Sequence, residues 1–342
     1  MFMRHLLRKI ARQCRSTVRL ATRLGILAGL FTLMVGCASE HRPSLDSSGE
    51  SGWQPWQVVN THTGLVLSSS DWLNELAAYE VVYLGEEHHN PYHIEAALKV
   101  LDSLVAHGLQ PTIGMEMFGW DGQQALDDYV LTDRLERSGF LGQVKWAQNW
   151  GGAFEDYEPL VAFARDRRLS LLAMNPPKPL IRRVVKAGLG QVRQEQEWAQ
   201  WGLDQEEIVD DPDYRARIID QLQQCHGGGT EEHFRTMYEA SMVRDEGMAK
   251  TLTAGLEALR RGTSSPRGVM VSYTGGGHIQ YGLPVPKRVA RRLSGPVKQT
   301  TVYMTSFDRS RIEEVRELVQ EKIADYVWLT PMSRKGPPKR CR

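Results

Sequence analysis

Residues 81–91 read Val-Val-Tyr-Leu-Gly-Glu-Glu-His-His-Asn-Pro, a short apolar run that ends in a polar cluster. The apolar part, Val81 to Leu84, is typical of a strand covered on both faces of a sheet. Asn90 is a good helix N-cap and Pro91 suits the first helical position, so a helix is predicted to follow. Because open α/β sheets bind ligands beyond the carboxyl ends of their strands, the polar cluster lies where chemistry is usually done.

Similar apolar runs recur along the chain, mostly with helical patterns between them. They lie at Val81–Leu84, Thr112–Met117, Leu169–Met174, Gly268–Tyr273, Thr300–Thr305 and Tyr326–Leu329. This alternation predicts an α/β fold with a mainly parallel sheet flanked by helices, over residues 56–332. Residues 120–157, rich in Asp, Gly and Trp, are predicted to form short helices capping one end. Residues 189–229 are polar, acidic and Gln-rich and predict a helical insertion with a hinge, and a long helix is expected from about Thr230 to Arg261.

The first 36 residues have the order of a secretory signal. Residues 1–23 carry seven basic side chains and no acidic one, and an apolar run from Leu24 to Val35 follows. That run is shorter than the ~20 residues of a membrane-spanning helix. Leu33-Met34-Val35-Gly36-Cys37 resembles a bacterial lipobox, and Ala38 after it resembles the default sorting to an outer membrane. We expect a lipoprotein signal peptide at 1–36, lipidation at Cys37 and a tether at 37–55; a membrane anchor or a misassigned start codon is the alternative.

Charge and cysteine content narrow the class of protein. The chain has 42 basic and 41 acidic residues, so removing the seven basic residues of the signal leaves 35 against 41, a net charge of about −6. A mildly acidic protein without a basic face is a poor candidate for nucleic-acid binding. Apart from the signal and lipobox cysteines, Cys225 and Cys341 remain and could form one disulfide. The last residues, 333–342, are a basic tail.

Polar residues interrupt or follow four of the apolar runs. They are Glu86 with His88 after the first, Glu116 within the second, Asn175 after the third, and His278 after a Gly-rich turn. A buried carboxylate such as Glu116 is costly unless it is paired. It either forms a structural ion pair with an Arg or His, or it faces Glu86 and His88. Since carboxyl ends of parallel strands meet at one edge, we expect these five side chains to share a ligand pocket above the sheet.

Two kinds of chemistry suit this set of residues. In the first, His88 and His278 ligate a divalent metal ion and Glu86 or Glu116 acts as the base of a hydrolase. In the second, the pocket holds a large flat ligand such as haem, with apolar walls from the Trp-rich segment. The sequence leaves both open.

A haem would need an axial ligand from the protein. Tyr157 and Tyr281 are candidates, although each could equally be a packing aromatic. Lys178, Arg182 and Arg183 could pair with acidic groups of a ligand, or they could form a solvated helix face.

With these residues in view, the chain resembles the ChaN-like haem-binding uptake lipoproteins, a branch of the Tiki/TraB and erythromycin-esterase superfamily. The resemblance covers roughly residues 75–290. Its matching segments are Leu84–Pro91, Met115–Phe118 with Gln124 and Leu126-Asp127, Trp150 to Leu160, Ala173–Asn175, Val243–Asp245 with Met248-Ala249, and Gly275–Gly282. It implies a lipid-anchored protein of haem or iron acquisition, in which haem can sit between two subunits of a homodimer on a tyrosine. Related superfamily members are hydrolases, so whether the protein is an enzyme stays open.

Overall fold

The computed structural model describes residues 52–262, 267–334 and 336. The chain divides into two compact units, Met1–Ser44 and Leu45–Arg342, and the described residues belong to the second. The predicted signal peptide, Cys37 and Cys341 lie outside the described residues. Within the described part, no helix combines the length and apolar character needed to cross a membrane.

An eight-stranded sheet is the centre of the second unit, in the order β2-β1-β8-β7-β3-β6-β4-β5. The six strands from β8 to β5 are parallel, and β1 pairs antiparallel with β2 and β8. All six predicted strands are present. The edge pair β1–β2 was not predicted, because strands of three and two residues carry too little pattern. The bounds are β1 Val58–Asn60, β2 Val66–Leu67, β3 Val81–Glu86, β4 Leu109–Gly119, β5 Leu171–Asn175, β6 Arg267–Gly275, β7 Gln299–Phe307 and β8 Tyr326–Pro331.

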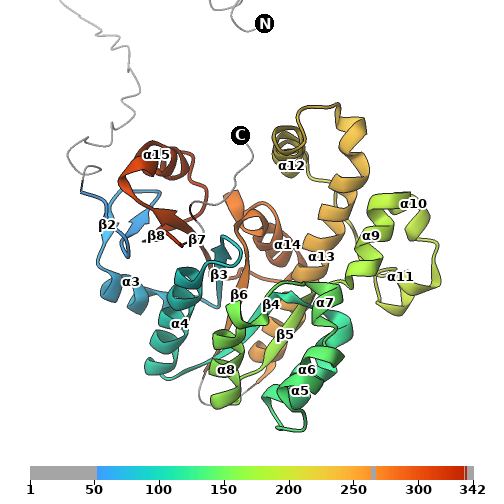
Figure 1. Cartoon of the computed structure of the whole chain (residues 1–342), viewed down its shortest axis with the longest axis horizontal. Helices are drawn as coiled ribbons and strands as arrows, with labels where there is room; N and C mark the ends of the chain where they lie inside the picture. Colours follow the sequence, from blue (N-terminus) through green and yellow to red (C-terminus); the bar gives the residue numbers. More distant parts are fainter. Residues whose placement is uncertain (1–51, 263–266, 335, 337–342) are drawn as a thin grey trace, which may run out of the picture. The chain divides into compact units, whose positions relative to one another are not determined.

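Helices cover both faces of the sheet, which confirms the predicted α/β class (Figure 1). Alternate strand residues point to opposite faces. In β3, Val82 and Leu84 join the core under α3, α4, α5 and α8, whereas Val81 and Tyr83 join the core under α13, α14 and α15. All four are fully buried. The helices are α3 Ser69–Glu75, α4 Pro91–Ala106, α5 Gln123–Val130, α8 Glu158–Asp166, α13 Glu231–Arg261, α14 Val285–Arg292 and α15 Ile312–Gln320.

A smaller helical subdomain lies beside the amino-terminal half of α13 (Figure 1). It contains α10 Leu189–Val192, α11 Gln196–Gln200 and α12 Pro212–Cys225, as predicted for residues 189–229. Two small apolar clusters attach it to α13 and to α9 (Lys178–Ala187), one around Trp198 and one around Tyr214. Cys225 is disulfide-bonded, and its predicted partner lies outside the described residues.

Short helices fill residues 120–157, as the sequence predicts. They are η2 Trp120–Gly122, α5, α6 Arg137–Gln143, α7 Trp146–Asn149 and η3 Phe154–Asp156. Trp146 packs against Phe118 of β4, with ring centroids 5.6 Å apart, and so anchors this segment on the sheet. The segment is therefore packed against the carboxyl end of β4.

Candidate functional site

Four neighbouring parallel strands, β3, β6, β4 and β5, bring the predicted polar residues to one edge of the sheet. Glu86 and Asn175 end β3 and β5, Glu116 lies near the end of β4, and His278 follows β6 in a short 3-10 turn. Glu116 Oε1 lies 3.2 Å from His278 Nε2. Residues 162 positions apart in the sequence thus meet because their strands end side by side.

The turn after β3 sends consecutive polar residues in different directions. Asn90 caps α4, accepting a hydrogen bond from the Tyr92 N–H at 3.0 Å. Glu87 faces β7, where the Thr305 hydroxyl donates to it at 2.9 Å. His88 and His89 line a cavity, and Glu86 lies beneath them.

Glu86 is a buried carboxylate that holds His88 in place. Its Oε1 lies 2.7 Å from His88 Nδ1, and it accepts hydrogen bonds from Tyr157 Oη at 2.9 Å and Tyr273 Oη at 2.6 Å. Burial raises the pKa of Glu86, although these three partners oppose the shift. Because Nδ1 of His88 is engaged, Nε2 is the ring nitrogen left for a ligand. A side chain at Gly275 would bring its Cβ to 2.8 Å from that ring, so glycine keeps this space open.

Glu116 is the second buried carboxylate, and it is paired with cations. Arg244 and His278 both contact its Oε1, and the Gly275 N–H donates to Oε2 at 2.7 Å. Burial alone would raise the pKa of Glu116, but the positive charges of His278, Arg244 and His88 outweigh it and hold the pKa well below its usual range. The carboxylate is therefore ionised and forms the predicted ion pair while also lying beside the other site residues.

His278 lies between two carboxylates. Its Nδ1 is 2.5 Å from Asp245 Oδ1, and Asp245 in turn accepts from Tyr214 Oη of the helical subdomain at 2.6 Å. Burial opposes protonation, but Glu116 and Asp245 raise the pKa of His278 to about 9. At neutral pH this imidazole is a cation.

A cavity of about 480 Å³ opens above these residues. Trp150 stands against the two histidines, with its ring centroid 4.9 Å from that of His88 and 6.4 Å from that of His89. His89 Nδ1 lies 2.7 Å from Asp156 Oδ2. The lining residues are His88, His89, Glu116, Asn149, Trp150, Gly151, Gly152, Asn175, Pro176, Lys178, Ile181, Arg182, Val185, Arg244 and His278.

The two tyrosines predicted as haem ligands, Tyr157 and Tyr281, are not among the residues that line this cavity. Tyr157 is fully buried, and its hydroxyl donates to Glu86 and accepts from the His89 N–H at 3.2 Å. Burial and the Glu86 charge raise its pKa, which disfavours the phenolate that would bind iron. Tyr281 donates to Glu321 at 2.6 Å outside the cavity. Both hydroxyls are occupied by the protein's own carboxylates.

The predicted divalent-metal site is not supported by the donor set. The described residues contain no group of three or more His, Cys, Asp or Glu side chains arranged to hold a metal ion. His278 has a carboxylate oxygen at each ring nitrogen, and Glu116 is shared between Arg244, His278 and a backbone N–H. His278 and Glu116 are thus already paired with groups of the protein, and of His88 only Nδ1 is engaged, by Glu86.

Sequence reasoning missed the roles of four residues: Arg244, Asp245, Tyr273 and His89. Arg244 and Asp245 are charged residues in the middle of a helix, next to fully buried Val243, and this was a usable signal. Tyr273 sits within an apolar strand, where its hydroxyl requires a partner when buried. His89 gave no signal beyond its place in the polar cluster.

Comparisons with known proteins agree with this architecture. A family model described as "Haem-binding uptake, Tiki superfamily, ChaN" matches residues 72–289. The solved structure of ChaN of Campylobacter jejuni, described as showing cofacial heme binding, matches with a TM-score of 0.59 and 17% identity. The match covers 79% of this chain and 95% of that one. It shows that the two share a fold.

Two further similarities are weaker. Protein RETICULATA-RELATED 5, chloroplastic, of Arabidopsis thaliana is 24% identical over 266 residues, which are 72% of this chain and 34% of that protein. The chain thus spans about a third of that relative's length. A structure of the erythromycin esterase EreC matches with a TM-score of 0.40 and 14% identity over 70% of this chain and 73% of that one, too slight a likeness to bear on function.

Proposed function

The chain belongs to the haem-binding uptake family ChaN of the Tiki superfamily, and from this premise we propose that it binds haem in the cavity above β3, β6, β4 and β5. The proposal includes a role in haem or iron acquisition at an outer membrane, with the protein anchored by lipid on Cys37. Haem is the cargo of such a protein.

The observation that carries the proposal is the geometry of His88. A buried carboxylate, Glu86, lies at its Nδ1, and its ring forms part of the cavity wall. A histidine whose other nitrogen faces a carboxylate is a frequent axial ligand of iron, because the carboxylate orients the ring and raises its basicity. We therefore replace the tyrosine ligands of the sequence-based hypothesis with His88.

The rest of the cavity suits a flat, largely apolar ligand. Its volume of about 480 Å³ lies within the ~300–1,000 Å³ of ordinary ligand pockets. Trp150, Ile181 and Val185 supply apolar walls, and Val185 is itself 42% exposed to solvent.

Titrating haem into the purified protein tests the proposal. We expect a shifted Soret band that saturates at a fixed stoichiometry, and a loss of affinity of tenfold or more in His88→Ala. Tyr281→Phe, whose hydroxyl lies outside the cavity, is the matched control and should bind as the wild type does. Absence of saturable binding would overturn the proposal. The expected homodimer is tested on the same samples by comparing the molar mass with and without haem.

A second candidate function is a hydrolase that works without a metal ion. It is favoured by one observation, the juxtaposition of a carboxylate-oriented imidazole, His88, with the cationic His278 beside Glu116. The pKa of His88 is raised by Glu86 and Glu116 against the effect of burial, so His88 would act as general base toward water in its deprotonated form. His278 would stabilise the negative charge that develops on the substrate. An esterase and amidase screen comparing wild type with His88→Gln tests it; activity that survives this change would exclude the mechanism.

A further inference from the structure

A second cavity, of about 370 Å³, lies in the helical subdomain. It is lined by residues of α11, by Arg193 directly after α10, and by residues 203–208 in the loop before α12. Among the described residues, none lines both this cavity and the one above the sheet. Its volume is typical of a pocket for a small molecule. The helical subdomain therefore has a cavity of its own.

The floor of this second cavity is apolar and fixed in place. Leu203 and Trp198 are 1% and 2% exposed, and both belong to the apolar cluster that attaches the subdomain to α9 and α13. Ile208, which is partly buried, packs against the same cluster. Because the packing of the subdomain holds these side chains, the floor is already formed before a ligand arrives.

The indole N–H of Trp198 is a hydrogen-bond donor that the protein leaves unused. The side chain is almost completely buried, and the small surface that it retains lines the second cavity. No acceptor among the described residues binds this N–H, and it is not sealed inside the protein as three other unpartnered indoles are. A buried indole N–H usually finds a hydrogen-bond partner. A ligand with an acceptor oxygen supplies that partner.

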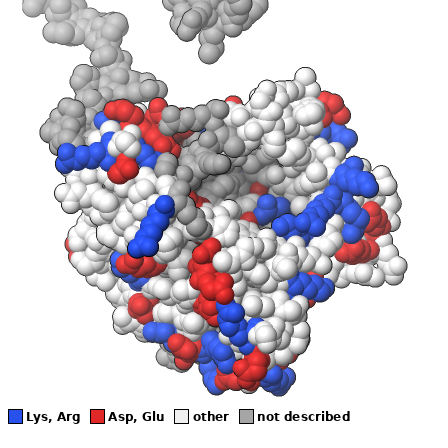
Figure 2. Space-filling view, in the orientation of Figure 1, with Lys and Arg blue, Asp and Glu red and all other residues white. Residues whose placement is uncertain are grey.

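Charged side chains surround this floor. The Arg193 guanidinium lies over the Trp198 ring, 6.0 Å from its centroid, and Asp204 and Glu207 line the cavity from the loop. These three charged residues are exposed, and none of them forms an ion pair within the part of the chain that the structure describes. Figure 2 shows basic and acidic side chains side by side on the right of the molecule, where Figure 1 places α10 and α11. The rim therefore offers charges of both signs to a ligand.

Glu206, the third carboxylate of the lining, is already paired within the protein. Arg292 contacts it, and Lys250 Nζ lies 3.4 Å from its Oε1. The charges left free in the second cavity are therefore one guanidinium and two carboxylates, which is one negative charge in excess. A complementary ligand carries one anionic group and two cationic groups on a short apolar chain.

We propose that the second cavity binds a free basic amino acid such as lysine. Its carboxylate accepts hydrogen bonds from Arg193 and from the Trp198 N–H, and its two amino groups pair with Asp204 and Glu207. Arginine can donate two parallel hydrogen bonds to a carboxylate, which adds both strength and geometric specificity. The methylene chain of the ligand lies on the apolar floor. The inference goes beyond the proposed function, because it concerns a different cavity and a different class of ligand.

Nuclear magnetic resonance of the purified protein, labelled with nitrogen-15 at tryptophan, tests the proposal. We expect one indole resonance, the one that is absent from Trp198→Phe, to shift saturably as L-lysine is added. Lysinamide lacks the carboxylate and norleucine lacks the side-chain amino group, so each should bind more weakly by roughly fivefold or more. Nα-acetyl-lysine, which resembles the carboxyl-terminal residue of a peptide, should also bind more weakly. Equal binding of this compound would overturn the assignment to a free amino acid.

Two variants at exposed positions test the two ends of the ligand separately. Arg193→Gln should remove the preference for lysine over lysinamide, and Glu207→Gln should reduce the preference for lysine over norleucine. Asp213→Asn neutralises an exposed carboxylate of α12 that does not line the cavity, so this matched control should bind lysine as the wild type does. Absence of a saturable shift of the Trp198 resonance, or equal binding of lysine and lysinamide by the wild type, would overturn the inference.

Haem titration of the same variants separates this inference from the proposed function. Neither Arg193 nor Glu207 lines the cavity above the sheet, so both variants should bind haem as the wild type does. A failure to bind lysine together with normal haem binding would overturn the second site alone.

Discussion

Among the described residues four carboxylates are almost completely buried, and two of them, Glu86 at 4% exposed and Glu246 at 0%, have surroundings that differ in kind. Glu86 is held by two tyrosine hydroxyls and an imidazole. Glu246 is held by three guanidinium groups. Of the two, only Glu86 contacts a residue that lines the cavity above the sheet.

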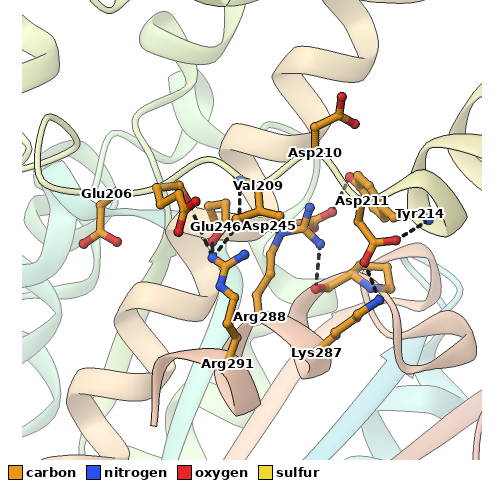
Figure 3. Close-up of polar contacts among 12 residues, drawn as sticks. Glu206, Val209, Asp210, Asp211, Tyr214, Asp245, Glu246, Lys287, Arg288 and Arg291 are labelled. Carbon is orange, nitrogen blue, oxygen red and sulfur yellow. Dashed lines mark hydrogen bonds and ion pairs between the residues drawn. The ribbon is translucent and has the colours of Figure 1, made fainter. Parts of the chain in front are cut away.

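The Glu246 cluster joins α13 to α14 and to the loop before α12 (Figure 3). Arg288 Nε lies 3.1 Å from Glu246 Oε1, and Arg291 and Arg292 lie 2.8 Å and 2.6 Å from Oε2. The Val209 N–H also donates to Oε1, at 3.2 Å. Guanidinium groups and a backbone N–H thus surround both oxygens of Glu246, which is the arrangement of a structural clamp.

The two sites show that a buried carboxylate can either stabilise the fold or orient a side chain that binds a ligand. Arginine remains protonated at all ordinary pH values, so the positive charge around Glu246 is permanent. The partners of Glu86 include the His88 imidazole, whose pKa is raised by Glu86 and Glu116 against the effect of burial and which can still exchange a proton. The first arrangement stabilises the fold, and the second leaves His88 able to accept a ligand or a proton.

The largest effect is expected from Glu246→Gln. Removing the charge leaves three guanidinium groups around a neutral amide, and losing one partner of a buried ion pair costs about 3–5 kcal/mol. Chemical denaturation should show this loss in the free energy of unfolding. Glu232→Gln, an exposed carboxylate at 80% on the same helix, should change stability by no more than about 0.5 kcal/mol. An equally small change in the free energy of unfolding in both variants would show that Glu246 stabilises the fold no more than an exposed carboxylate does.

The next effect is a dependence of stability on pH through His278. Its folded pKa of about 9 lies above the ordinary value of 6.5, so the stabilisation is complete below pH 6.5 and is lost as pH rises through 9. The shift corresponds to roughly 3 kcal/mol. Denaturation curves between pH 6 and 10 measure it. His278→Gln should flatten this part of the profile, and an equally steep decline in the variant would contradict the assignment.

Glu86→Gln should separate function from stability. Burial already disfavours the ionised form, and in glutamine the amide oxygen can accept from one tyrosine hydroxyl while the amide N–H donates to the other, so unfolding should change by about 1 kcal/mol or less. Haem affinity should fall by about 10–100-fold, because His88 loses the carboxylate that orients it. Soret titration and denaturation of one preparation measure both. A loss of stability as large as that of Glu246→Gln would show that Glu86, like Glu246, has a structural role.

The smallest effect is expected from Tyr214→Phe. The hydroxyl donates to Asp245 at 2.6 Å, and its removal leaves that carboxylate with His278 alone, at a cost of about 1–2 kcal/mol. Thermal unfolding measures the change. Haem binding should be retained, since Tyr214 does not line the cavity. A change in affinity larger than the change in stability would instead link the helical subdomain to ligand binding.

Much of the fold follows from local pattern. Asn90 and Pro91 start α4 as predicted, and the apolar runs that became β3–β8 are long enough to show their character. The pairing of Glu116 with His278 also followed from the rule that parallel strand ends meet. The strands β1 and β2 were not predicted, because they are too short to show a pattern and because β1 is held in the sheet by β8, which is distant in the chain.

The distribution of roles within the site did not follow from pattern. Glu86 and Glu87 are adjacent and chemically identical, but one lies under the cavity and the other faces β7. Tyr157 was predicted as a candidate haem ligand, but its hydroxyl donates a hydrogen bond to Glu86. Such outcomes depend on which side chains of other elements pack against each residue. The local sequence pattern carries no information about these contacts.

The amino-acid sequence by itself determined the α/β class, the six parallel strands and the edge at which polar residues gather, because periodicity and capping act over a few residues. Only the tertiary structure decided that His88 faces the cavity, that Arg244 neutralises Glu116 and that α9 turns two cations inward. These choices depend on burial and on contacts between distant segments, and both exist only once the chain is packed.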